Sequence, residues 1–231
     1  MKLYHGTSQI RAREIIRDGI LPRKITKLKS NFEIVSHPDR VYLTNSYALY
    51  FGFGTAHIDH CASAAIIEIE VDKIDPTLLL FDEDVLEQLG RNQDDLPKHW
   101  NMEKRTEYYR DMIDSRRHRE LSWDISLKAM GTCAYHGSIN PMAISRIALV
   151  DGSLQTALKW GALDASISLA NYQIVGKKYK AMTKWIFDEN LTDPREEWEK
   201  PMYPWPPSPD RNGIKVFIND QREFLNMGEN I

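Results

Sequence analysis

The stretch KLYHGTSQIRAREIIRDGILP near the start of the chain constrains the fold more than any other segment. Lys2–His5 has the composition of a strand, and Thr7 or Ser8 can accept hydrogen bonds from the first free backbone amides of a helix over residues 9–18. Gly19 then suits the left-handed position that ends many helices, and a proline soon afterwards stops the helix from continuing. We therefore expect the chain to run from a strand directly into a helix, with a histidine at the end of the strand.

The alternation in AAIIEIEVD (64–72) predicts a half-buried strand with an apolar inner face and an acidic outer face. Other segments predict further regular elements. Strands are expected at residues 41–44, 132–139, 143–151 and, as a sheet edge, 214–220; helices are expected at 122–130 and over most of 153–191. This mixture of elements indicates an α+β protein.

The chain divides into a predicted core and a predicted extension. Residues 1–151 hold most of the expected strands, with a helical insertion near 84–130. Residues 152–231 are expected to form a helical extension and a tail that pack on the core. The tail includes PMYPWPPSPD (201–210), whose prolines exclude a helix or a central strand.

The bulk composition is that of an ordinary globular protein, with 42% hydrophobic and 27% charged residues and a net charge of −3. Cys61 and Cys133 are too few for a disulfide framework. Residues 1–21 lack the apolar region of a signal peptide, and no apolar run approaches the roughly 18 residues of a membrane span. These features predict a cytoplasmic protein without membrane contact.

Charge is unevenly distributed along the chain. Residues 11–29 hold seven basic and two acidic side chains, whereas residues 188–231 hold ten acidic and five basic ones. Charged runs are most often solvated faces, and the alternative is a basic rim beside an active site. In that alternative, the segment 11–29 and the charged arm at 103–119 would suit an RNA or DNA partner.

Four segments of the chain are similar, in this order, to one superfamily. They are YHGTS with the helix that ends in DGILP, VYLTNSYALYFGFG, AIIEIEVD, and AYHGSINPMAISRIALV. Together they resemble the ADP-ribosyltransferases of the diphtheria-toxin and poly(ADP-ribose) polymerase type, and the related RNA 2′-phosphotransferases, over about residues 2–151. The resemblance implies an α+β fold with split antiparallel sheets that form an NAD cleft, surrounded by peripheral helices.

The resemblance also implies NAD⁺ as a co-substrate and assigns residues to it. In this superfamily a histidine on the first strand hydrogen-bonds a ribose hydroxyl, the next glycine lets the backbone hold the nicotinamide carboxamide, and tyrosines flank the nicotinamide ring. Carried over residue by residue, the NAD-binding set is His5, Gly6, Thr7, Tyr42 and Tyr50.

This assignment suits the chemistry of the reaction. Cleavage of the nicotinamide–ribose bond creates an oxocarbenium-like centre, so the enzyme must hold the dinucleotide in place and immobilise the leaving ring. Two aromatic faces can hold a planar cation at about 0.5–2 kcal/mol for each contact. A glycine after the histidine removes a Cβ that would block the carboxamide.

The chain departs from the superfamily at the third motif. A glutamate usually opens the late strand, where it hydrogen-bonds the ribose and orients the acceptor. Here the matching position falls at Thr132, which can bond a ribose hydroxyl but cannot act as a carboxylate. Glu120 and Asp124 lie on the approach to this strand and are the alternatives. The expected catalytic set is therefore His5, Tyr42 and Thr132.

Each candidate residue also has a structural explanation. A histidine at a strand end, like His5, is more often structural than catalytic, and Tyr42 and Tyr50 can be core residues. In HIDHC, residues His57, His60 and Cys61 would share one helical face and could bind zinc. No further cysteine pair supports this, so we expect no metal.

The resemblance implies an NAD-dependent mono-ADP-ribosyltransferase, a transferase of the glycosyltransferase class, that modifies a macromolecule. The acceptor is RNA, DNA or a protein. Single-domain enzymes of this kind often resemble toxins or phage-conflict effectors, which implies a regulatory partner such as an antitoxin. A binding module that holds NAD⁺ or ADP-ribose without turnover is the alternative, and an RNA 2′-phosphotransferase is the third.

Overall fold

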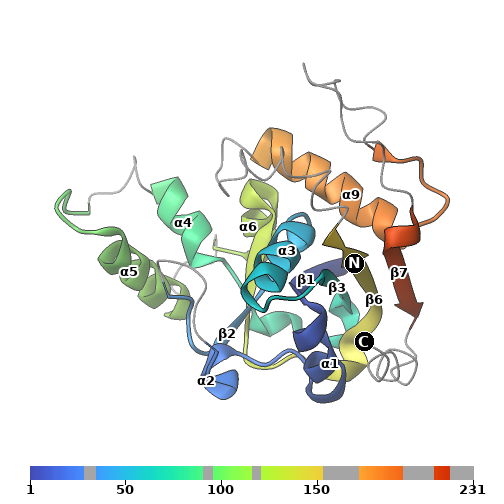
Figure 1. Ribbon diagram of the computed structural model, residues 1–231. Helices are drawn as coiled ribbons and strands as arrows, with labels where there is room; N and C mark the ends of the chain where they lie inside the picture. The colour runs from blue at the N-terminus through green and yellow to red at the C-terminus, as the bar shows by residue number, and fades with distance from the viewer. Residues whose placement is uncertain (29–34, 91–95, 116–120, 153–171, 195–210, 219–231) are drawn as a thin grey trace.

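The computed structural model describes residues 1–28, 35–90, 96–115, 121–152, 172–194 and 211–218 (Figure 1). Within these residues the protein is an α+β fold built on an antiparallel sheet, which confirms the predicted class. In their order across the sheet, the strands are β4 (Leu79–Leu80), β5 (Thr132–His136), β2 (Arg40–Thr44), β1 (Lys2–Ser8), β3 (Ser63–Glu70), β6 (Ile144–Asp151) and β7 (Ile214–Ile218).

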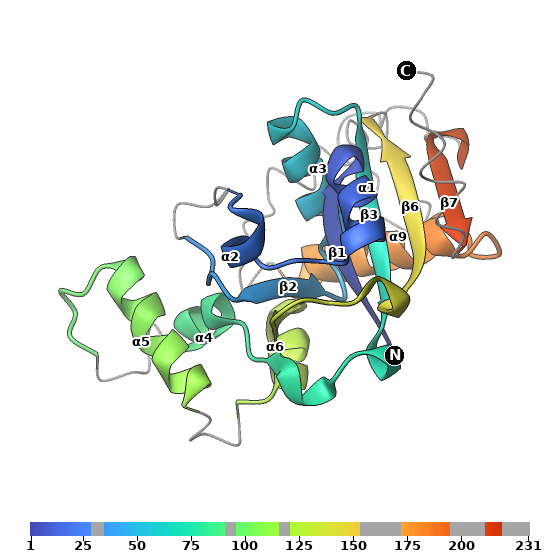
Figure 2. The ribbon, with the colours of Figure 1, turned by 90° about the horizontal axis from the view of Figure 1, so that it is seen from below.

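Helices cover both faces of this sheet. They are α1 (Gln9–Asp18), α2 (Arg23–Thr26), α3 (Ala48–Ile58), α4 (Glu83–Gly90), α5 (Met102–Asp114), α6 (Trp123–Met130) and α9 (Lys177–Phe187). Successive residues of β1 face opposite layers, since Leu3 packs with Ala12 of α1 and Tyr4 packs with α3 and α9. Figure 2 shows α1 in front of β1 and β3 and α9 behind them. Helices α4 and α5 pack together at the β4–β5 end.

The predicted unit of strand, cap, helix and stop is confirmed. Ser8 caps α1, because its Oγ accepts a hydrogen bond from the backbone N–H of Arg11 at 3.3 Å. Gly19 ends the helix with a φ of 85°, which glycine adopts without strain. Ile20 then pairs with Ile139 in an isolated bridge, so the end of α1 is fixed to the turn before β6.

The prediction of an acidic outer face on the third strand is wrong. β3 is central, paired with β1 on one side and β6 on the other, and its inner residues are buried on both faces. The Glu68 side chain is only 1% exposed and accepts hydrogen bonds from Arg146 at 2.9 and 2.5 Å. Burial opposes ionisation of Glu68, but Arg146 and Ser145 hold its pKa below the ordinary value. Arg146, which is far from Glu68 in sequence but opposite it on β6, therefore makes the buried carboxylate compatible with the core.

The expected pair of split sheets is also corrected, because the described strands form one continuous sheet. The junction between β1 and β2 is narrow, however. β1 pairs with β3 over seven residues but with β2 at a single register pair, Tyr4 with Thr44. Beyond this pair β1 and β2 separate, and His5 is the next residue on β1.

The described part of the extension packs on the core. A π-helical turn, Tyr172–Gly176, leads into α9, whose Tyr179 and Met182 join the core residues of α3 and β1. β7 pairs with β6 at the sheet edge, which confirms the edge strand expected near residues 214–220. The proline-rich stretch 201–210 lies outside the described residues.

The proposed zinc face of HIDHC is not formed. α3 ends at Ile58, and His60 follows it with a φ of 52°, so His57, His60 and Cys61 do not share a helical face. Among the residues that the structure describes, no group of three or more His, Cys, Asp or Glu side chains could hold a metal ion.

Candidate functional site

His5 directly follows the single register pair of β1 with β2, and its imidazole contacts the main chain of β2. Its Nδ1 is 3.1 Å from the backbone carbonyl oxygen of Tyr42. Because a carbonyl can only accept, Nδ1 carries the hydrogen and donates it, and in the neutral ring the Nε2 lone pair remains an acceptor. Burial lowers the pKa of His5, the Tyr42 carbonyl opposes this effect, and the charge of Arg11 lowers the pKa further. The ring is therefore neutral near pH 7.

Gly6 is explained by packing. A Cβ at Gly6 would lie 1.9 Å from the carbonyl oxygen of Ala48 and 2.7 Å from the backbone nitrogen of Gly52, both in α3. β1 and α3 thus approach so closely that only glycine fits. Thr7, the next residue, is buried and paired with Ala65 of β3. The backbone of both residues belongs to the β1–β3 ladder.

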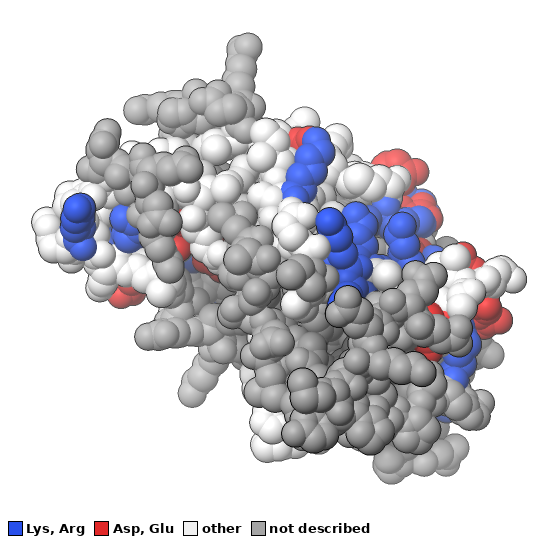
Figure 3. Space-filling model, turned by 90° about the horizontal axis from the view of Figure 1, so that it is seen from above, with Lys and Arg blue, Asp and Glu red and all other residues white. Residues whose placement is uncertain are grey.

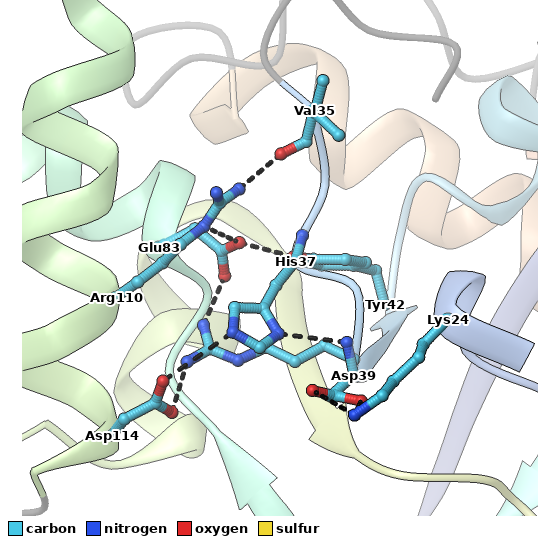
Figure 4. Close-up of polar contacts among 9 residues, drawn as sticks. Lys24, Val35, His37, Asp39, Tyr42, Glu83, Arg110 and Asp114 are labelled. Carbon is cyan, nitrogen blue, oxygen red and sulfur yellow. Dashed lines mark hydrogen bonds and ion pairs between the residues drawn. The ribbon is translucent and has the colours of Figure 1, made fainter. Parts of the chain in front are cut away.

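The phenol ring of Tyr42 points toward α4, where its Oη donates to Oε1 of Glu83 at 2.5 Å (Figure 4). The same oxygen accepts a hydrogen bond from the backbone N–H of His37 at 2.9 Å. Burial and the negative charge of Glu83 raise the pKa of Tyr42 well above its ordinary value. Tyr42 is therefore a neutral phenol. Its orientation is fixed by His37, five residues earlier in the chain, and by Glu83 on α4.

Glu83 is the centre of an ion cluster that ties three segments together (Figure 4). It accepts from Arg40 Nη1 at 2.8 Å and from Arg110 Nε at 3.0 Å, and Arg40 also donates to Asp114 at 2.6 Å. Burial opposes the ionisation of Glu83, but Arg40, Tyr42 and Arg110 lower its pKa. Arg110 also donates to the carbonyl of Val35 at 2.6 Å. The segment before β2 is thereby attached to α5.

Tyr50 occupies a different aromatic cluster. Its ring contacts Phe51 and Tyr179 edge to face, with centroids 5.6 and 6.3 Å away, and it packs against the core between α3 and α9. Tyr42 packs instead against the core around α4 and α5. The structure thus brings His5 to the main chain of Tyr42, while the two tyrosine rings have separate surroundings.

Thr132 begins β5 and has a buried carboxyl group beside it. The side chain of Asp82, only 5% exposed, accepts a hydrogen bond from the backbone N–H of Asp84 at 3.0 Å, and the Thr132 hydroxyl acts to lower the pKa of Asp82. Burial, then the charges of Asp84 and Glu83, raise the pKa of Asp82 well above its ordinary value. Sequence reasoning missed Asp82, because the segment FDED before α4 is typical of a helix start.

The alternative carboxylates have other surroundings. Asp124 bonds Lys128 and Ser122, which lower its pKa, at the start of α6. Glu120 lies outside the described residues. Of these acids, Asp82 is the one whose pKa the Thr132 hydroxyl acts to lower.

Comparisons with models of known protein families and with curated proteins find no match to this chain. No helix within the described ranges is both long enough and apolar enough to cross a membrane.

Proposed function

We propose that this protein is an NAD-dependent mono-ADP-ribosyltransferase that modifies a macromolecule, with that superfamily's α+β fold in a form whose sheet is continuous. The observation that carries the proposal is the position of His5. Its ring lies where β1 and β2 separate, Nδ1–H donates to the Tyr42 main chain, and Nε2 is left as an acceptor. A neutral acceptor nitrogen fits a ribose hydroxyl, which the resemblance requires at this residue.

The residues present fit NAD⁺ in the following roles. His5 accepts a hydrogen bond from a ribose hydroxyl and thereby orients the sugar. Tyr42, whose hydroxyl is fixed by Glu83 and His37, contributes its main-chain carbonyl, which fixes the tautomer and orientation of the His5 ring. When bound, NAD⁺ supplies the nicotinamide–ribose bond that breaks and the ADP-ribosyl group that is transferred.

The acceptor is proposed to be a polyanion, and nucleic acid is the class that fits best. Figure 3 shows Lys and Arg side chains grouped on the face seen from above, where α9 lies in Figure 1. α9 contains four lysines and no acidic residue, and Lys177, Lys180 and Lys184 follow one another at helical spacing. The basic segment 11–29 offers less positive charge for a polyanion, because three of its basic side chains are in ion pairs. Asp59 pairs with Arg11, Asp18 with Arg17 and Asp39 with Lys24.

The first test is release of nicotinamide from NAD⁺ and transfer of labelled ADP-ribose to a cell extract. Wild-type protein should do both, and His5→Ala should lower both rates by about tenfold or more, since a positioning hydrogen bond is lost. His57→Ala is the matched control, because His57 is exposed on α3 and should leave the rates within about twofold. If the wild-type protein neither releases nicotinamide nor transfers ADP-ribose, the proposed enzymatic activity is refuted.

A binding module that holds NAD⁺ without turnover remains the second candidate. It is favoured by the threonine at the start of β5, where the superfamily has a carboxylate. Calorimetry distinguishes the two, because heat of NAD⁺ binding without nicotinamide release would support the module.

A further inference from the structure

We propose that His37 makes the turn that leads into β2, residues 37–40, a pH-sensitive switch. The turn is closed onto Tyr42 while the His37 ring is neutral, and it opens when the ring takes up a proton. In the closed form the backbone N–H of Arg40 donates to the carbonyl of His37 at 3.4 Å. The switch goes beyond the proposed enzymatic activity and does not depend on it, because its contacts lie within the protein.

The His37 ring takes part in the turn as a hydrogen-bond acceptor (Figure 4). Its Nδ1 accepts from the backbone N–H of Asp39 at 3.2 Å. Since an acceptor nitrogen needs a free lone pair, the hydrogen of the neutral ring is on Nε2, which lies 3.8 Å from Oδ2 of Asp114. A further proton must therefore bind Nδ1, where it would face the Asp39 N–H. Protonation removes the bond between the ring and the turn.

The closed turn is attached to two strands through its backbone. The N–H of His37 donates to Oη of Tyr42 at 2.9 Å, and the carbonyl of Asp39 accepts from the N–H of Gly137, just after β5, at 2.8 Å. Tyr42 in turn holds the ring of His5 through its own carbonyl. An open turn would leave Tyr42 anchored by Glu83 without the second bond to its hydroxyl.

The charged groups around His37 balance one another while its ring is neutral. Each acid among them is paired with a basic side chain at 2.6 to 3.1 Å. The groups are Arg40 on β2, Glu83 on α4, Arg110 and Asp114 on α5, and Asp39 of the turn with Lys24 of α2. The His37 side chain is 18% exposed, so a proton on its ring adds a positive charge to a balanced and partly buried set.

The pKa of His37 gives the direction of the switch. Burial lowers this pKa, Arg40 and Arg110 lower it further, and Asp114 and Glu83 oppose them in part. In the open turn the ring is solvated and has its ordinary pKa of 6.5. As pH falls below 6.5, the open form therefore binds more protons than the closed form. The ratio of open to closed turns then rises by up to about tenfold for each pH unit, until the lowered pKa is reached.

The test is amide hydrogen exchange of the full-length protein, followed by NMR between pH 7.5 and pH 5 and corrected for the pH dependence of exchange in a free peptide. In the wild type, the protection of the His37 and Asp39 amides should fall by about threefold or more from pH 6.5 to pH 5.5. His37→Asn should keep its protection within about twofold over that range, because the asparagine oxygen can accept from the Asp39 N–H and does not titrate.

His57→Asn is the matched control, since His57 is exposed on α3, and it should keep the wild-type pH dependence. Wild-type protection that is constant down to pH 5.5 would overturn the switch. An equal fall in His37→Asn would also overturn it, because the fall would then come from other groups, such as His5 or Glu83.

Should His37→Asn not fold, the ¹⁵N resonance of His37 Nδ1 in the wild type decides. The amide resonance of Asp39 must titrate with the same midpoint as Nδ1, and an Asp39 amide that does not follow the ring refutes the switch. None of these measurements uses NAD⁺. A failure of the switch therefore leaves the proposed enzymatic activity standing, and a protein that releases no nicotinamide leaves the switch standing.

Discussion

At Gly6 the close packing of α3 on β1 leaves no room for a side chain, so this residue tests the packing independently of any ligand. Gly6→Ala should lower the free energy of unfolding by about 1–3 kcal/mol, because its Cβ would meet backbone atoms of α3 that cannot rotate away. Urea denaturation measures the change. Gly54→Ala is the control: its Cβ meets nothing within 4 Å, and alanine in a helix should raise stability by about 0.5–1 kcal/mol. A neutral Gly6→Ala would contradict the close approach of β1 and α3.

At the scale of elements, the cluster around Glu83 joins α4, α5 and β2. The Arg40 side chain is 0% exposed and that of Glu83 is 1% exposed, so the pair is fully buried. Removing one partner leaves a buried charge uncompensated. This contact adds to the apolar cluster that packs α4 and α5 against β4 and β5.

Glu83→Ala should therefore lower the free energy of unfolding by about 3–5 kcal/mol at pH 7. Because the folded pKa of Glu83 is lowered, its stabilising effect is present above the unfolded value of 4.5 and is lost as pH falls through the folded pKa. Glu83→Gln should remove that part of the acid dependence. Thermal melts between pH 7 and pH 3 measure both effects. Glu107→Ala, an exposed acid on α5, should change stability by less than about 0.5 kcal/mol.

At the scale of the whole molecule, the distribution of charge bears on the nucleic-acid acceptor that we propose. A net charge of −3 argues against general attraction to nucleic acid, so any affinity must come from one face. α9 carries the largest net positive charge among the described helices, and Tyr179 and Met182 attach its other side to the core.

Lys177→Glu with Lys184→Glu should weaken binding to RNA or single-stranded DNA by about tenfold or more at low salt, and should reduce the salt dependence of the affinity. Fluorescence anisotropy over a salt series measures both. The matched control is Lys98→Glu with Lys104→Glu, which changes net charge equally near α5. Equal losses in the two double variants would show that the affinity is not specific to the α9 face.

The first 20 residues are predictable because their signals are local. A strand, a Ser8 cap and a Gly19 stop each depend on neighbours a few residues away, and the structure confirms all three. The same holds for the helix that ends at Gly131, where φ is 76°. Turn and cap chemistry is set by backbone sterics within one turn of helix, so it can be read from the sequence alone.

Other features depend on residues far apart in the chain. The local pattern predicts Glu68 on a solvent face, and only Arg146 on β6 makes its burial stable. A strand motif points to Tyr42, but the orientation of its ring depends on Glu83, 41 residues later. The pKa of Asp82 depends on Thr132 of β5, which lies 50 positions later in the chain.

The order of residues is enough to specify the α+β class, the strand and helix at the amino end, and the group of residues that resembles an NAD site. Contacts between distant segments are needed to make the sheet continuous, to place Tyr50 in the α3–α9 core, and to set a buried carboxyl beside Thr132. Hydrophobic periodicity and capping act over a few residues, whereas ion pairing, burial and pKa depend on which strands become neighbours.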